Sequence, residues 1–235
     1  DFAGTSAVSM AWVMLSDDHR ALAVERHGPT ARWAERRAKK VIGERAEDVI
    51  VVRGDVLDVR PPDVPRVDVV AALNFSVFEH HTRAALRDYF KSARRSLRRD
   101  GVLVVDAYGG PGAMRVGVQR RHVKPRAIDV IDEREPLPDD FDYQWDQRAY
   151  DAVTGRVDCR IHFGERTNFR GQFRGSGASE SRGLGKSDGT SLTDAFRYDW
   201  RLWTLPELCE GMSEAGFVDV RVWCDAYDAK AGASD

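Results

Sequence analysis

Short aliphatic runs alternate with helical patterns through the first half of the chain, and this alternation constrains the fold more than any other feature. The runs are rich in valine and alanine and too short for helices; they cover 21–24, 49–52, 67–73 and 102–105. The helical patterns, with apolar residues three or four positions apart, cover 8–15, 29–42 and 83–97. Continuous apolar strands that alternate with helices are typical of a parallel sheet covered on both faces. The sequence therefore predicts an α/β protein with a doubly wound, mostly parallel sheet.

The second half changes in character after Gly109-Gly110, where antiparallel strands are expected instead of strand–helix alternation. Residues 143–150 and 157–163 predict a hairpin that turns near Thr154-Gly155, and residues 196–203 predict a third strand. Thr204 and Glu207 form a capping-box pattern, with a proline between them, at the start of a helix. After that helix, residues 217–223 predict a last strand.

One segment of the second half, residues 164–191, is rich in glycine, serine and arginine and poor in aliphatic residues. Such a composition cannot bury enough apolar surface to order itself, so we expect a flexible excursion. Its stretch FRGQFRG, at 169–175, is similar to arginine–glycine tails that bind nucleic acids. A solvated loop is the favoured interpretation, because the formal net charge of the whole chain is only −2.

The composition is that of a globular protein of one domain rather than two. Of its 235 residues, 42% are hydrophobic and 31% are charged, which argues against disorder. No apolar run approaches the ~20 residues that a membrane span needs, and no signal-peptide pattern is present. The three cysteines have no CxxC spacing, so neither a disulfide framework nor a structural zinc site is expected: they are Cys159, Cys209 and Cys224. A cytoplasmic location is the default expectation.

The first residues and the strand that follows them predict a nucleoside-cofactor site. Asp1 and Gly4 form an acid and a turn directly before a helix whose expected apolar face is Val8, Ala11, Trp12 and Leu15. The next strand ends on Glu25. Ligands of doubly wound sheets bind at the carboxyl ends of the strands, where an acid can accept hydrogen bonds from ribose hydroxyls.

Six pieces of the sequence, in this order, resemble class I S-adenosylmethionine-dependent methyltransferases, of the bacterial group with a DF(C/A)GT-type first motif. The pieces are DFAGTSA at 1–7, the strand that ends at Glu25, RGDV at 53–56, AALNFS at 71–76, LVVDAYGG at 103–110, and YDWRLWTLPEL at 198–208 with AGF at 215–217. The resemblance implies a Rossmann-like fold in which the antiparallel strands are inserted after the fifth strand. It also implies S-adenosylmethionine as cofactor and a small-molecule methyl acceptor.

The resemblance also implies how the chain is divided. Residues 1–110 would be the cofactor-binding half, 111–203 an antiparallel cap over the site, and 204–235 the last helix and strand. The family's central first strand would lie before Asp1, so we expect the chain to be a fragment that is incomplete at both ends.

The family's cofactor-binding positions carry over to eight residues of this chain: Asp1, Gly4, Thr5, Glu25, Asp55, Val56, Asn74 and Phe75. Asp1 and Gly4 match the positions that hold the methionine end of the cofactor, and Glu25 matches the ribose acid. Asp55 and Val56 match the pair beside adenine. Asn74 and Phe75 match the segment that lines the reaction cavity. Ionised carboxylates suit these roles because they only accept hydrogen bonds, whereas the ribose diol and the exocyclic amine both donate.

Each of these residues also has a structural interpretation. Asp1 and Glu25 could be solvated charges, Asp55 could cap the next turn, Asn74 could be a turn residue, and Phe75 could belong to the core. A catalytic base is unknown; Tyr108 and His80 are the candidates, although a polar loop before the Thr82 cap is the favoured interpretation for His80 and its neighbour His81.

Two other classes of function remain open from the sequence. A nicotinamide dehydrogenase would need a GxGxxG turn, and here Gly4 has Ser6 and Ala7 where further glycines would fall. A non-catalytic methyltransferase-like subunit, or an inactive fragment, would keep the fold and lose the reaction.

Overall fold

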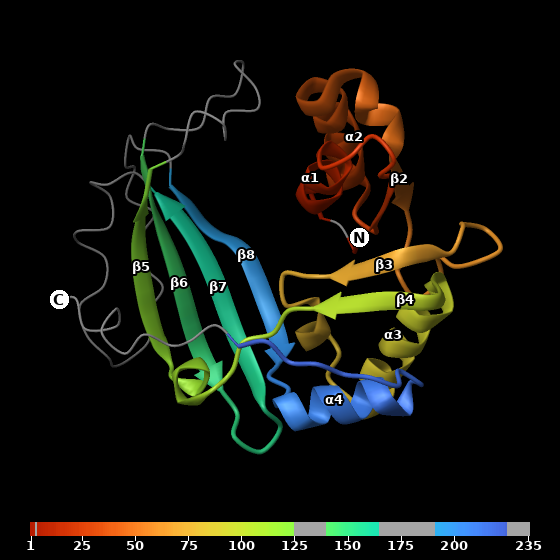
Figure 1. The fold of residues 1–235 in the computed structure, drawn as a ribbon. Helices are drawn as coiled ribbons and strands as arrows, with labels where there is room; N and C mark the ends of the chain where they lie inside the picture. Colours follow the sequence, from red (N-terminus) through yellow and green to blue (C-terminus); the bar gives the residue numbers. More distant parts are fainter. Residues whose placement is uncertain (3, 125–139, 165–190, 225–235) are drawn as a thin grey trace.

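The computed structural model describes residues 1–2, 4–124, 140–164 and 191–224, and its first half is a parallel α/β sheet (Figure 1). It consists of two separate hydrogen-bonded pairs of parallel strands: β1 (Ala21–Glu25) with β2 (Val49–Arg53), and β3 (Val67–Ala72) with β4 (Leu97–Val105). Asp1 and Phe2 lie between the pairs. The Phe2 N–H donates to the carbonyl of Ala71 at 3.0 Å, and the Asp1 carbonyl accepts from Val24 N–H at 2.9 Å. They occupy the position that the sequence predicts for the end of the first strand.

The helices of the first half pack against this sheet, and two short 3-10 helices, η1 (Gly43–Asp48) and η2 (Ser76–Glu79), follow the second helix and β3. The strands are not buried on both faces as the sequence predicts, because Ile50, Val69, Val102 and Val104 are 38–56% exposed. Helices α1 (Ala7–Met14) and α2 (Gly28–Ile42) bury Met10, Val13 and Ala38 against β1 and β2. Helix α3 (Arg83–Ser96) lies against β3, β4 and α4 (Leu205–Glu214) (Figure 1).

The second half is an antiparallel sheet that follows β4 and a 3-10 helix, η3 (Pro111–Met114). Its strands lie in chain order: β5 (Gly117–Val123), β6 (Phe141–Tyr150), β7 (Arg156–Gly164) and β8 (Leu192–Arg201). The predicted hairpin at Thr154-Gly155 joins β6 to β7, and Gly155 has the positive φ of +71° that this turn requires. The expected α/β fold with an antiparallel insertion is confirmed. The insertion follows β4, which is the fifth strand in the numbering of the resembled family.

One hydrophobic core connects the two sheets. Phe78, Phe90 and Leu208 come from the α/β part, and Val157 and Trp200 come from β7 and β8; all five are buried in one cluster. The two helix caps that the sequence predicts are also present beside this core. Thr82 Oγ1 accepts from Ala85 N–H at 3.1 Å, and Thr204 with Glu207 forms the complete capping box.

The predicted apolar face of the first helix was wrong. Ser9, Met10 and Val13 are buried in α1, whereas Leu15 lies beyond its end with 74% of its surface exposed; Val8 and Trp12 are exposed as well. Most residues of α1 are apolar, so spacing alone does not distinguish one face from the other. The carboxylate of Asp1 decides, because it accepts hydrogen bonds from Ser9 and holds that side of the helix inward.

Two further sequence predictions of secondary structure need correction, and one strand was missed. Residues 217–223 do not form a strand: the Phe217 N–H closes the end of α4 on the Met212 carbonyl at 3.1 Å, and Val218 is fully exposed. A strand pattern needs a neighbouring backbone to pair with, which the pattern itself does not supply. The predicted strand 196–203 lies at 192–201, and β5 was not predicted, because most of its side chains are polar and exposed. The expected excursion at 164–191 lies outside the described residues apart from its ends.

Candidate cofactor and acceptor site

The predicted site residues lie at one edge of the parallel sheet. Glu25 ends β1, Gly54-Asp55 follows β2, and Asn74 follows β3. Because these strands are parallel, their carboxyl ends share that edge. The edge is closed between β1 and β2 by a hydrogen bond of 3.2 Å from Gly54 N–H to the Glu25 carbonyl. The sheet therefore brings together segments that are up to 49 residues apart in the sequence.

Asp1 lies at the start of α1, and the turn after it leaves room beside the backbone. One carboxylate oxygen of Asp1 accepts from Ser9 Oγ at 2.8 Å and from Ser9 N–H at 3.2 Å. Gly4 has a φ of +51°, and a side chain placed there would meet no atom within 4 Å. Thr5 is exposed, while Ser6 is fully buried and its hydroxyl has no hydrogen-bond partner among the described residues. An open backbone turn beside a fixed carboxylate suits a polar ligand.

Glu25 and Asp55 are both fixed through one oxygen. Oε1 of Glu25 accepts from the backbone N–H of His27 at 2.6 Å, and Oδ1 of Asp55 accepts from Leu57 N–H at 2.9 Å. Within the described part of the chain, the second oxygen of each carboxylate has no hydrogen-bond partner. Asp55 therefore does cap the following turn, as the structural interpretation expects, and still has an acceptor for a ligand. Val56 follows it, half-buried, with its carbonyl accepting from Ser92 Oγ at 2.8 Å.

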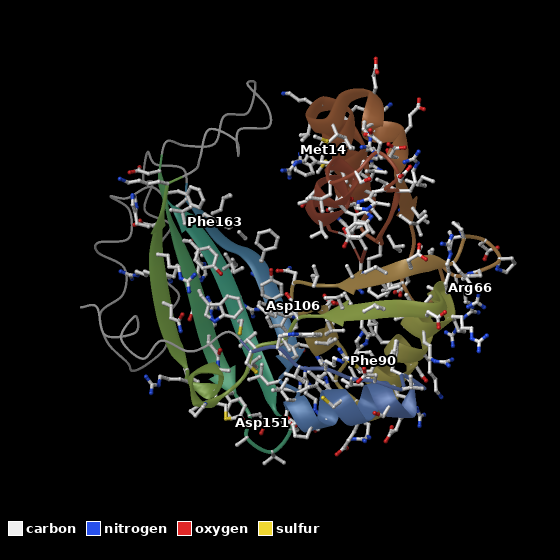
Figure 2. All side chains as sticks on the ribbon, in the orientation of Figure 1. Met14, Arg66, Phe90, Asp106, Asp151 and Phe163 are labelled. Carbon is white, nitrogen blue, oxygen red and sulfur yellow. The ribbon has the colours of Figure 1, made fainter. Side chains whose placement is uncertain are left out.

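Asn74 and Phe75 form a strained loop that Asp106 holds. Both residues have positive φ, +58° and +60°, which non-glycine residues rarely adopt. The two oxygens of Asp106 accept from Asn74 N–H at 3.0 Å and from Phe75 N–H at 2.7 Å. Figure 2 places Asp106 where the parallel strands meet the antiparallel sheet. Asp106 lies in the LVVDAYGG piece, but sequence reasoning gave it no role, because its partners are about 30 residues away.

The two candidate bases, His80 and Tyr108, both contact aromatic rings. The His80 ring is 4.3 Å from the Tyr89 ring, and burial lowers the pKa of His80 to about 4 despite the nearby charge of Asp55. The Tyr108 ring contacts Phe75 edge-on at 4.9 Å, and its buried hydroxyl has no hydrogen-bond partner among the described residues. Burial raises the pKa of Tyr108. At neutral pH, His80 is therefore a neutral acceptor and Tyr108 a protonated donor.

Neither a protein-family model nor a curated protein sequence matches the chain. Solved structures do match. The CcbJ methyltransferase from Streptomyces caelestis superposes with a TM-score of 0.61 at 16% identity, over 91% of this chain and 69% of that chain. The fold is that of the S-adenosylmethionine-dependent methyltransferases. The sugar N-methyltransferase KedS8 from Streptoalloteichus has a TM-score of 0.54 at 15% identity, over 92% of this chain and 79% of that chain. DesVI from Streptomyces venezuelae reaches 0.56 at 14% identity, over 91% and 82% of the two chains.

The methyltransferase fold places the antiparallel sheet beside the predicted cofactor edge. Strand β8 contacts η2, directly after Phe75. Over the described ranges, no helix could cross a membrane, and no group of three or more His, Cys, Asp or Glu residues could hold a metal ion.

Proposed function

We propose that the protein transfers a methyl group from S-adenosylmethionine to a small-molecule acceptor. The observation that carries this proposal is the convergence of Gly4, Glu25, Asp55 and the Asn74-Phe75 loop at the carboxyl edge of a methyltransferase-like sheet. Each position belongs to a different segment of the chain, and each has the chemical group that the matching family position uses to bind the cofactor. The sugar N-methyltransferase among the similar structures supports a small acceptor, as does CalS10, an amino pentose methyltransferase with bound cofactor (TM-score 0.54, 13% identity).

The chemistry of the residues fits the cofactor. The unpaired oxygens of Glu25 and Asp55 can accept from the ribose hydroxyls and the adenine amine. The open backbone at Gly4 can admit the methionine end beside Asp1. When bound, the cofactor would supply an electrophilic methyl group on a sulfonium. The protein's part would be to align the acceptor and exclude water. Alignment of this kind lowers the activation free energy by at most roughly 7–11 kcal/mol.

A proton acceptor is needed only if the methylated atom must lose a proton. His80 is the candidate for that role, since its ring is neutral at pH 7, but its lowered pKa of about 4 makes it a weak base. Tyr108 is suited to donate a hydrogen bond to the acceptor, because its phenol stays protonated and lacks a partner in the described structure. These two roles stay predictions of the proposal.

The test is calorimetric titration of the protein with S-adenosylmethionine and, in parallel, with NAD. We expect S-adenosylmethionine to bind and NAD not to bind. Binding of NAD alone would instead support the dehydrogenase. Mass spectrometry of a panel of small amines and phenols, incubated with cofactor and protein, then reports methyl transfer. Cofactor binding without transfer to any panel member would favour the non-catalytic subunit.

A further inference from the structure

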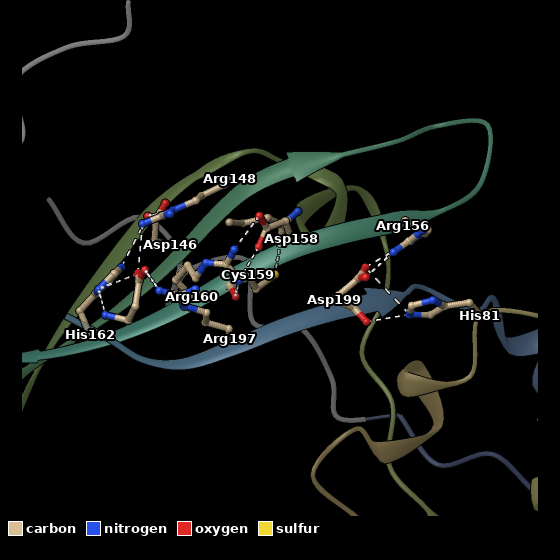
Figure 3. Close-up of polar contacts among 12 residues, drawn as sticks. His81, Asp146, Arg148, Arg156, Asp158, Cys159, Arg160, His162, Arg197 and Asp199 are labelled. Atoms are coloured by element: carbon tan, nitrogen blue, oxygen red, sulfur yellow. Dashed lines mark hydrogen bonds and ion pairs between the residues drawn. The ribbon is translucent and has the colours of Figure 1, made fainter. Parts of the chain in front are cut away.

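The two faces of the antiparallel sheet differ in chemistry. The strand register places aromatic side chains on one face: Phe141, Tyr143, Trp145, Phe163, Phe196, Tyr198 and Trp200. We call these seven residues the aromatic face. Charged residues occupy the opposite face, including Asp146, Arg148, Arg160 and Arg197 (Figure 3). Strand pairing alone would not require this difference, because a strand exposes alternate residues to opposite sides whatever their type.

The rings of the aromatic face form a continuous row along β8. Phe163 and Phe196 lie 6.3 Å apart between ring centroids, Phe196 and Tyr198 are parallel at 6.4 Å, and Tyr198 stacks on Trp200 at 4.3 Å. The row continues across the domain, because Trp200 is 6.1 Å from the Phe75 ring. Its inner end is therefore the loop that Asp106 holds beside the predicted cofactor residues.

The row runs from the surface into the core. Trp200 is buried at 4% exposure, whereas Phe196 is 52% exposed, and Phe163 and Tyr198 are half-buried. Rings that only completed the core would be covered along the whole row. Contiguous exposed aromatic surface in a folded protein typically marks a binding site. The exposed part of the row is also continuous with the cofactor edge through Trp200 and Phe75.

We propose that the methyl acceptor is a planar aromatic compound that stacks on Phe196 and Tyr198 with its reacting end toward Phe75. This inference rests on the proposed methyl transfer. Offset stacking favours flat ligands, because the electron-rich faces of the protein's rings attract the positive edges of another ring.

The experiment compares two probes of equal size and different shape, 2-naphthol and its saturated counterpart decahydro-2-naphthol. Each is titrated into the protein, with and without S-adenosylmethionine, and binding is followed by ligand-observed NMR. We expect 2-naphthol to bind at least tenfold more tightly than the saturated alcohol. Phe196→Ala and Tyr198→Ala should each weaken 2-naphthol binding at least fivefold. Arg197→Ala, between them on the charged face, is the matched control and should leave binding unchanged.

Three outcomes would overturn the inference. The two probes could bind equally tightly, Phe196→Ala and Tyr198→Ala could bind 2-naphthol as tightly as the wild type, or the Arg197→Ala control could lose as much affinity for 2-naphthol as they do. A concentration-dependent dimer that Phe196→Ala dissociates would also overturn it, since a second copy would then cover the aromatic face. The cofactor titration separates the two proposals. If the protein binds the cofactor but not 2-naphthol, only the acceptor class is refuted. If it binds 2-naphthol but does not bind the cofactor, the methyl transfer is refuted.

Discussion

The carboxylate of Asp106, directly after β4, accepts a hydrogen bond of 2.7 Å from the backbone N–H of Phe75, in the loop after the neighbouring strand β3. Its other oxygen accepts from Asn74 at 3.0 Å, so a single side chain satisfies two consecutive donors. Both donors belong to residues with positive φ, a conformation that costs of order 1–3 kcal/mol per residue. Asp106 thus stabilises a loop shape that the local sequence disfavours.

We predict that Asp106→Ala lowers the free energy of unfolding by about 2–3 kcal/mol, because hydrogen bonds to charged groups contribute ~1.5–3 kcal/mol each. Asp106→Asn should lose about half as much, since an amide keeps one acceptor oxygen. Urea unfolding measures both. Asp88→Ala, an exposed position on α3, is the control. If both variants match the wild type in stability and in cofactor affinity, Asp106 has no role in holding the loop.

Glu25→Ala is expected to weaken S-adenosylmethionine binding by ~2–3 kcal/mol, through loss of charge-assisted hydrogen bonds to the ribose. Calorimetry measures the affinity, and circular dichroism checks the fold, because Glu25 also accepts from His27 N–H at 2.6 Å. Glu35→Ala, exposed on α2, serves as the control. Unchanged affinity in a folded Glu25→Ala protein would remove Glu25 from the cofactor site.

His80 should make stability depend on pH in the mildly acidic range. Burial lowers its folded pKa from 6.5 to about 4, so the unfolded chain binds the proton first as the pH falls. The contribution of His80 to the free energy of unfolding is complete above pH ~6.5 and is lost as the pH falls toward about 4. Between pH 6.5 and 5 the free energy of unfolding should fall by about 2 kcal/mol. Urea unfolding at both pH values should show a smaller difference in His80→Gln. Equal pH dependence in the two proteins would contradict the burial of His80.

Cys159 and Cys224 should react with thiol reagents at very different rates. Burial, followed by the charges of Asp158 and Asp146, raises the pKa of Cys159 to about 12, so almost no thiolate forms at pH 8. Cys224 is exposed. Labelling with a maleimide, followed by peptide mass spectrometry, should modify Cys224 within minutes and Cys159 only after urea is added. Fast labelling of Cys159 in the folded protein would indicate that β7 opens readily.

The sequence alone predicts the features that local patterns control. Aliphatic runs such as 49–52 predict parallel strands, and the structure has these strands although Ile50 of β2 is 56% exposed. Thr82, Thr204 and Gly155 mark helix starts and a hairpin turn, because capping and positive φ are properties of a few adjacent residues. Glu25 at the end of β1 was predicted in the same way.

Tertiary structure decided the features that depend on distant partners. The buried face of α1 follows from the contact of Asp1 with Ser9, and the loop at Asn74 follows from Asp106. Strand β5 forms because β6 offers it a backbone to pair with, whereas 217–223 pair with no described strand. The continuity from Phe196 to Phe75 was also hidden, since Phe196 lies on β8 and Phe75 in the loop after β3, about 120 residues earlier in the chain. The spacing of apolar residues can be seen in the sequence, but only long-range hydrogen bonds and packing decide what those residues face.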